Sequence, residues 1–226
     1  MSILGNRVVR KEDPKFLTVG GTYVDDVPLE GAAYVSFVRS TAAHARITGI
    51  DLDEARSAPG VIGFFSAADV AGEPIPPESR ILNQAMPQPV LARDVVRYVG
   101  EPVVAVITEE RYQGPDAAEL VFVDYEPLPV LVDVEDAANG EVLLHPDAGS
   151  NVIIDLAFGR TDDLFEGCEV VLRQRIVNQR VAPCPLEVRA GAASWGEDGR
   201  LTYWASTQGA HTWKRELAQG LGLEED

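Results

Sequence analysis

A short polar run near the C-terminal end of the chain holds the residues best suited to chemistry. It reads Ser206-Thr207-Gln208, and His211 follows three residues later. A glutamine amide offers two N–H donors and one carbonyl acceptor in a fixed plane. Such an amide can donate to an oxygen bound to a metal without adding charge or displacing a ligand. The alternative is a glutamine at the end of a strand that bonds local backbone, and the pattern alone favours that alternative.

Two histidines are further candidates. His211 could contact a cofactor or orient Gln208, or it could be an ordinary residue of a first helical turn. Metal ligation by His211 is disfavoured, because no second histidine or cysteine lies at a ligand spacing from it. His44 has the residue type that titrates near neutral pH. The small residues around His44 indicate close backbone packing, however, so a buried structural histidine is predicted.

One acidic residue, Glu187, lies alone between Glu169 and Glu197 in a stretch that carries four arginines. A structural ion pair is the preferred interpretation of Glu187. The arginines could bind a cofactor phosphate or an acidic partner, or they could solvate a strand face. They are Arg173, Arg175, Arg180 and Arg189.

The overall charge is strongly acidic: 19 Lys and Arg stand against 36 Asp and Glu in 226 residues, a formal net charge of -17. Such an excess repels phosphate backbones and disfavours non-specific nucleic-acid binding. Cys168 and Cys184 form no C-x-x-C pair, so neither a zinc site nor an iron–sulfur cluster is expected within the chain. Two isolated cysteines suit a reducing compartment. With no apolar run of signal-peptide or membrane-span length, a soluble, cytoplasmic protein is predicted.

The helices and strands predicted to position these residues form an α+β pattern. Residues 102–107 form an unbroken apolar run rich in β-branched residues, which predicts a central strand covered on both faces within a mixed sheet. The predicted divisions are an N-terminal arm over 1–17, a first domain over 18–132, an acidic, turn-rich linker over 133–168, and a terminal body over 169–226. Within the first domain, the proline-rich residues 72–89 are predicted to form a surface loop.

The remaining elements are predicted from alternation, capping residues and turn residues. In the first domain they are strands over 33–39, 46–52, 61–65 and 121–126, a short helix over 54–56 capped by Asp53, and a helix over 114–120. In the terminal body they are a strand over 169–181 with a bulge near Ile176, a hairpin over 190–195 and 200–205, and a helix over 212–221.

Several segments, in order, resemble the large subunits of the molybdenum hydroxylases, the family of xanthine dehydrogenase and aerobic carbon monoxide dehydrogenase. Six segments resemble the family's α/β hammerhead domain: residues 20–26, which begin Gly20-Gly21-Thr22-Tyr23, and residues 37–47, 59–61, 99–103, 117–121 and 123–129. Pro185-Leu186-Glu187 and residues 204–211 resemble the opening of its molybdopterin-binding domain. The sequence departs from the family at Val188, where proline is usual, and at Gly114-Pro115, inside a helix that is usually unbroken.

The resemblance implies a hammerhead domain followed by an incomplete molybdopterin-binding domain. It implies a molybdenum–molybdopterin cytosine dinucleotide cofactor, with iron–sulfur and FAD groups on partner subunits. Gln208 would be the cofactor-binding residue, donating to an oxo ligand of the metal. The family's catalytic glutamate belongs to a glycine-flanked motif absent from this sequence, so Glu187 is not that base and no catalytic residue or metal ligand is assigned.

Three functions stay open at this point. The chain could be the N-terminal portion of a large subunit that oxidises a small molecule with oxygen derived from water. It could instead be a split or truncated assembly module, inactive until a partner chain completes the cofactor site. A stand-alone acidic binding domain is the third, and Ser206-Thr207-Gln208 argues against it. The substrate stays open among carbon monoxide, a purine, an aldehyde and a heteroaromatic compound. The opening of the sequence resembles the carbon monoxide dehydrogenase type of subunit more than the fused eukaryotic type.

Overall fold

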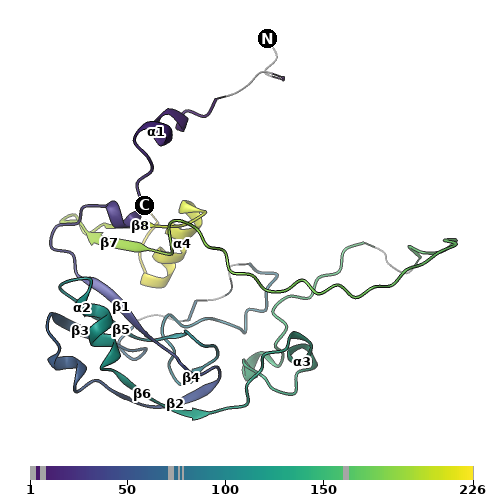
Figure 1. Ribbon diagram of the computed structural model, residues 1–226, viewed down its shortest axis with the longest axis horizontal. Helices are drawn as coiled ribbons and strands as arrows, with labels where there is room; N and C mark the ends of the chain where they lie inside the picture. Colours follow the sequence, from purple (N-terminus) through teal and green to yellow (C-terminus); the bar gives the residue numbers. More distant parts are fainter. Residues whose placement is uncertain are drawn as a thin grey trace. The chain divides into compact units, whose positions relative to one another are not determined.

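The computed structural model divides the chain into two compact units (Figure 1). It describes residues 4–5, 9–70, 74–75, 77, 79–159 and 163–225, so parts of the predicted N-terminal arm, proline-rich loop and linker lie outside the described residues. Unit 1 comprises Met1–Gly31 and Gln174–Lys214, and unit 2 comprises Ala32–Arg173 and Arg215–Asp226. In the described part of the chain, no helix is long and apolar enough to cross a membrane.

Unit 2 is built around two three-stranded sheets. The first has the order β1-β5-β3, from Tyr34–Arg39, Pro102–Thr108 and Val61–Phe65. The second has the order β4-β2-β6, from Val95–Val96, Ala45–Asp51 and Phe122–Pro127. The predicted α+β class is confirmed. Every pairing in both sheets is antiparallel, however, so the predicted mixed sheet is wrong. An apolar run indicates burial on both faces, and burial does not determine strand direction.

Strand β5 is the centre of its sheet, as predicted. Val103, Val104 and Val106 are fully buried, and β5 pairs with β1 on one edge and with β3 on the other. Helix α2 (Gln113–Glu119) packs against both β1 and β5. On the other side of the strand, Ala105 joins a small buried cluster with Ala67 and Leu91. The unbroken apolar run is therefore explained by coverage on both faces.

The backbone amides of residues 103–107 should exchange hydrogen with solvent more slowly than those of the edge strands. A central strand donates to neighbours on both sides and opens only when the sheet opens. Hydrogen exchange followed by NMR provides the measurement, and the edge strand β6 provides the comparison. Hydrogen exchange in β5 as fast as in β6 would show that β5 is not a protected central strand.

Helix α2 approaches the sheet through Gly114, one of the departures from the family pattern. A Cβ added at Gly114 would lie 2.2 Å from Oγ and 2.9 Å from Cβ of Ser36 on β1. The glycine is therefore required by close packing of helix on sheet. The following proline lies in the first helical turn, where its missing N–H costs nothing.

His44 has the structural role predicted for it. Its side chain is 8% exposed, and Nδ1 lies 2.7 Å from the carbonyl oxygen of Pro129. The His44 carbonyl also accepts the N–H of Leu128 at 3.0 Å. His44 therefore joins the start of β2 to the chain that leaves β6.

A buried carboxyl, Glu101, organises the turn that leads into β5. It is 4% exposed, and its Oε2 accepts the backbone N–H of Arg97. Its carbonyl accepts the N–H of Ser40 at 2.8 Å. Burial raises the pKa of Glu101 above its ordinary 4.5, and the hydrogen bond and positive charge of Arg97 oppose part of that rise.

The stabilising effect of this raised pKa should be present at low pH and lost as pH rises. The folded protein holds the proton at pH values where the unfolded chain has released it, so stability falls as pH increases through the folded pKa. Glu101→Gln cannot ionise and keeps an oxygen acceptor for Arg97. Its free energy of unfolding should therefore improve relative to the original chain between about pH 4 and about pH 7.

Urea unfolding at the two pH values measures this difference, and Glu109→Gln, at an exposed glutamate, removes the same charge as a control. Equal pH dependence in the two variants would show that burial of Glu101 does not affect stability.

The predicted linker lies in unit 2 and carries helix α3 (Val134–Asn139). Asp133 caps α3 by accepting the backbone N–H groups of Glu135 and Asp136, and Gly140 ends it with a φ of 74°. The side chain of Arg97 donates to the carbonyl of Leu144 at 2.8 Å. This bond therefore attaches the N-terminal half of the linker to the turn between β4 and β5.

The predicted cap at Asp53 is wrong. The short helix is a 3-10 turn over Ala55–Ser57 that follows Glu54, and no side chain caps it. Asp51 instead accepts the backbone N–H of Asp53 at 2.9 Å. Asp53 therefore lies in the turn before the helix, and Glu54 occupies the capping position.

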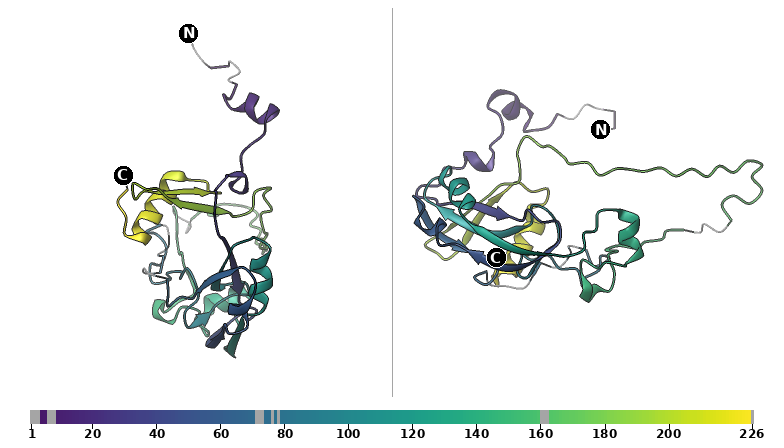
Figure 2. Two further views of the ribbon diagram at one scale, coloured as in Figure 1. Left: turned by 90° about the vertical axis from the view of Figure 1, so that its left-hand side faces the viewer. Right: turned by 60° about the horizontal axis from the view of Figure 1, so that its bottom comes forward.

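Unit 1 contains the predicted hairpin, formed by β7 (Gly191–Trp195) and β8 (Leu201–Ala205) (Figure 2). Gly199 turns between the strands with a φ of 80°. The N-terminal part of unit 1 holds helix α1 (Asp13–Thr18) and a 3-10 turn over Val24–Asp26. Helix α4 (Ala210–Leu221) confirms the predicted terminal helix and continues beyond Lys214 into residues assigned to unit 2.

The predicted strand over residues 169–181 is wrong. This segment forms neither helix nor strand in the structure, so the predicted bulge near Ile176 does not arise. Local alternation indicates only that a segment suits a strand, whereas a strand also requires a neighbour to accept and donate its backbone hydrogen bonds.

Candidate functional site

Gln208 lies in a bend between the end of β8 and the start of α4. Its side chain is exposed and forms no hydrogen bond among the described residues, so the bond to local backbone that was the alternative prediction does not form. Both amide N–H donors remain available to a group outside the chain. The cofactor-binding role of Gln208 stays a prediction.

The hydroxyl of Ser206 fixes the strand end just before Gln208. Its Oγ accepts the N–H of Ala190 at 2.7 Å and lies 3.0 Å from the carbonyl oxygen of Val188. The backbone N–H of Ser206 donates to the carbonyl of Ala190 at 3.1 Å. These bonds join the end of β8 to the chain that enters β7, and they set the position from which the Gln208 bend begins.

The other side of the bend is fixed by the first turn of α4. Thr207 Oγ1 accepts the N–H of Gly209 at 3.2 Å, and the Gly209 carbonyl accepts the N–H of Trp213 at 3.0 Å. The Trp213 ring lies against Tyr203 of β8, with 6.3 Å between ring centroids. Gln208 is therefore held between an anchored strand end and an anchored helix start.

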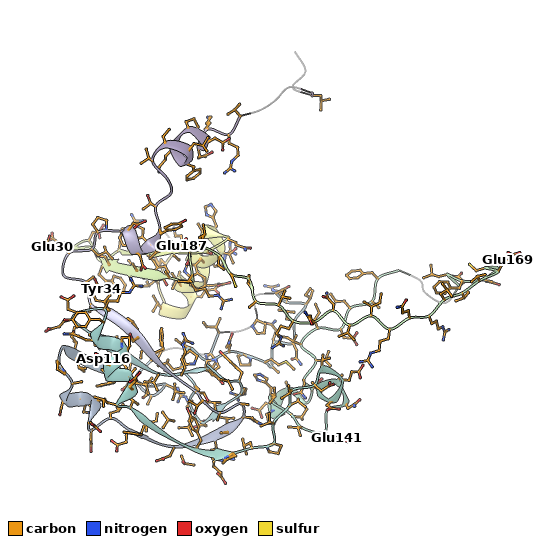
Figure 3. All side chains as sticks on the ribbon, viewed as in Figure 1. Glu30, Tyr34, Asp116, Glu141, Glu169 and Glu187 are labelled. Carbon is orange, nitrogen blue, oxygen red and sulfur yellow. The ribbon has the colours of Figure 1, made fainter. Side chains whose placement is uncertain are left out.

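Glu187 joins the two chain segments that make up unit 1. Its Oε1 accepts the backbone N–H of Val24 at 2.9 Å, which links the 3-10 turn near the N-terminus to the segment before the hairpin (Figure 3). No arginine pairs with Glu187 in the described part of the chain, so the predicted ion pair is wrong. A first-turn N–H has no partner within its own helix, and the carboxylate supplies one.

The other candidates remain on the surface. His211 is exposed in the first turn of α4, which agrees with the ordinary helical alternative, and it forms no hydrogen bond with Gln208 among the residues described. Cys168 and Cys184 are exposed free thiols. The described ranges contain no group of three His, Cys, Asp or Glu residues that could hold a metal ion. The four arginines from Arg173 to Arg189 are exposed.

Two family profiles match most of the sequence. Residues 18–129 match the a/b hammerhead domain of aldehyde oxidase and xanthine dehydrogenase, and residues 144–226 match the molybdopterin cofactor-binding domain. The chain belongs to the molybdenum hydroxylase large-subunit family. It corresponds to the hammerhead domain and the start of the cofactor-binding domain, as the resemblance implied.

Relatives in this family match along nearly the whole chain. It is 39% identical over 231 residues to the nicotine 6-hydroxylase large subunit of Paenarthrobacter nicotinovorans, covering 99% of this chain and 28% of that one. It is 36% identical over 239 residues to the carbon monoxide dehydrogenase large chain of Afipia carboxidovorans, covering 98% and 29%. The relatives' names mark them as subunits of larger assemblies.

Solved structures of the family share the fold. The quinoline 2-oxidoreductase of Pseudomonas putida 86 superposes with a TM-score of 0.84 at 33% identity, covering 96% of this chain and 28% of that one. The carbon monoxide dehydrogenase of Oligotropha carboxidovorans gives 0.84 at 35% identity, covering 98% and 29%. The chain thus spans less than a third of the length of each of these four relatives.

The sequence pattern indicates Gln208 but not the contacts that hold it. Ser206 has a positioning role that depends on Val188 and Ala190, which are distant in sequence. The bond between Glu187 and Val24 joins residues 163 positions apart. The isolation of Glu187 among arginines was a signal that it has a specific partner, but it suggested the wrong kind of partner.

Proposed function

We propose that this chain is the N-terminal portion of a molybdenum-cofactor-binding oxidoreductase large subunit of the carbon monoxide dehydrogenase and xanthine dehydrogenase type. The completed protein oxidises a small-molecule substrate with oxygen derived from water, in the cytoplasm. The observation that carries the proposal is the exposed amide of Gln208, which forms no hydrogen bond with the residues that the structure describes and is anchored on both sides at the family's Ser-Thr-Gln position. The proposal includes the division of the chain into an N-terminal arm that ends at residue 17, a first domain that ends at residue 132 and a linker that ends at residue 168.

The donor set at the bend suits a molybdenum–molybdopterin cytosine dinucleotide. The Ser206 and Thr207 hydroxyls are occupied by backbone partners, and the neutral amide of Gln208 is exposed. A neutral donor can bind an electron-rich oxygen of the group without adding charge. When bound, the cofactor supplies the two-electron oxidation, and iron–sulfur and FAD groups on partner subunits carry the electrons away. This chain contributes one positioned hydrogen bond and the backbone that aims it.

Reconstitution tests the proposal. The chain is joined in frame to the part of the Afipia carboxidovorans large chain that follows the matched stretch, and this chimera is co-expressed with the partner subunits of that enzyme. We expect bound molybdenum and substrate-dependent dye reduction. A folded, assembled chimera without molybdenum would contradict the proposal.

A second candidate is a split assembly module that is inactive until a partner chain completes the cofactor site. Either candidate needs the rest of the cofactor-binding domain, because the matched stretch covers 28% of the nicotine 6-hydroxylase large subunit. The two candidates differ in the chain expressed alone. An assembly module should purify without molybdenum and acquire it only when the complementary chain is supplied separately.

A further inference from the structure

Two aromatic rings close the stretch of chain that carries Gln208. The Tyr203 ring on β8 and the Trp213 ring on α4 have centroids 6.3 Å apart and an interplanar angle of 39°. This separation lies within the usual range of about 4.5–7 Å for interacting aromatic pairs. The backbone N–H of Trp213 also donates to the carbonyl of Gly209, the residue after Gln208. The ring contact therefore joins the strand before the bend to the helical turn after it.

Gly191 on β7 leaves space for the Tyr203 ring. In the β7–β8 pair, Gly191 lies opposite Ala205 and Ala193 lies opposite Tyr203, so Gly191 is the diagonal neighbour of Tyr203 on one face of the hairpin. A Cβ added at Gly191 would lie 2.1 Å from the hydroxyl oxygen and 2.9 Å from Cζ of Tyr203. Gly191 does not have a positive φ, so the ring and not the backbone requires glycine there.

The hydrogen bonds of the bend each act on one side of Gln208. Ser206 bonds the chain that enters β7, and Thr207 accepts the N–H of Gly209 within the bend. The contact between Tyr203 and Trp213 connects the two sides, so it limits rotation of the first turn of α4 about the end of β8. Loss of the ring contact should therefore leave the strand end in place and release the start of the helix.

We propose that Tyr203 and Trp213 are positioning residues that set the direction of the Gln208 amide in the completed enzyme. The inference rests on the proposed function of Gln208. The Gln208 side chain forms no hydrogen bond among the described residues, so its direction depends on the backbone on either side of it. Positioning matters at a reacting centre, where a displacement of about 1 Å can cost about 100-fold in rate.

Hydrogen exchange on this chain alone tests whether the rings hold the bend, without any cofactor. The backbone amide of residue 213 should lose at least roughly 10-fold in protection in Trp213→Ala, whereas the amide of Ser206 should not change. Trp213→Phe keeps an aromatic ring and should recover most of the loss. The matched control is Trp195→Ala, because Trp195 is 59% exposed at the turn end of β7. Unchanged protection of residue 213 in Trp213→Ala, with β5 protected in all variants, would overturn the inference.

Turnover of the chimera tests whether the rings act through Gln208. Trp213→Ala should lower kcat by up to about 10-fold, the loss expected for Gln208→Ala, because a misdirected amide is no better than an absent one. In the Gln208→Ala background, Trp213→Ala should add less than about twofold, because two changes to one interaction are not additive. Losses that multiply in the double variant would overturn the inference, since the rings would then act independently of the amide.

Gly191→Ala displaces the Tyr203 ring while both rings stay in the chain. It should also lower kcat, and adding Tyr203→Phe should restore part of the loss by removing the atom nearest to the new methyl group. Molybdenum per protomer, measured on the same proteins, should change less than kcat. An unmodified chimera without molybdenum would contradict the proposed function. Molybdenum in that chimera, together with multiplying losses, would overturn only the positioning role of the rings.

Discussion

Replacing Gln208 by glutamate should lower the turnover of the reconstituted enzyme by roughly 100-fold, the scale of losing a positioned donor at a reacting centre. The substitution exchanges an N–H donor for a negative charge beside an electron-rich oxygen, which repels where the amide attracts. Gln208→Ala only removes the donor, and a water molecule can replace it. We therefore expect a smaller loss for alanine, about 10-fold, which is typical of a group that supports a metal site from outside its ligands.

Molybdenum per protomer, measured beside turnover, separates the role of Gln208 from cofactor loading. Loading should change less than rate in both variants. A protonated carboxyl regains a donor, so the glutamate variant should recover activity, relative to alanine, as pH falls. Wild-type rates in both variants would mean that Gln208 is an ordinary residue of the bend.

Replacing Gly114 by alanine should destabilise unit 2 by about 2 kcal/mol, the usual cost of overpacking a core. The new methyl group would overlap both Oγ and Cβ of Ser36, and Cβ cannot move unless strand β1 moves. Alanine gains up to about 1 kcal/mol over glycine in a helix interior. That gain is smaller in the first turn, so the steric cost is larger than the gain in helix propensity.

The double variant Gly114→Ala with Ser36→Gly removes the obstructing side chain and should recover much of the lost stability. Gly63→Ala is the matched control, because no atom lies within 4 Å of a Cβ added there. Urea unfolding measures all four proteins. Equal losses in Gly114→Ala and in the double variant would show that Ser36 is not what requires glycine at this position.

Local patterns in the sequence predicted the elements whose partners are close in sequence or whose burial is complete. The β7–β8 hairpin follows from alternation around Asp198-Gly199, because a two-stranded pair needs only a turn to bring its strands together. The apolar run of β5 predicted a central strand, because coverage on both faces requires apolar residues at every position. The ordered segments that resemble the family also predicted both matched domains.

Strand direction and long-range partners were decided only by the tertiary structure. The antiparallel course of both sheets, the approach of Gly114 to Ser36 and the bond from Val24 to Glu187 depend on segments distant in sequence. The same holds for the anchoring of the Gln208 bend, since Ser206 bonds Val188 and Ala190 in the chain that enters β7.

Residues 169–181 show why the two kinds of information differ. Their β-branched side chains favour a strand, and that property is set by the sequence alone. A strand exists, however, only where a second segment satisfies its backbone groups, and in the described part of the chain this segment forms no strand. Propensity is local and is determined by the sequence, whereas pairing is a property of two segments brought together in space.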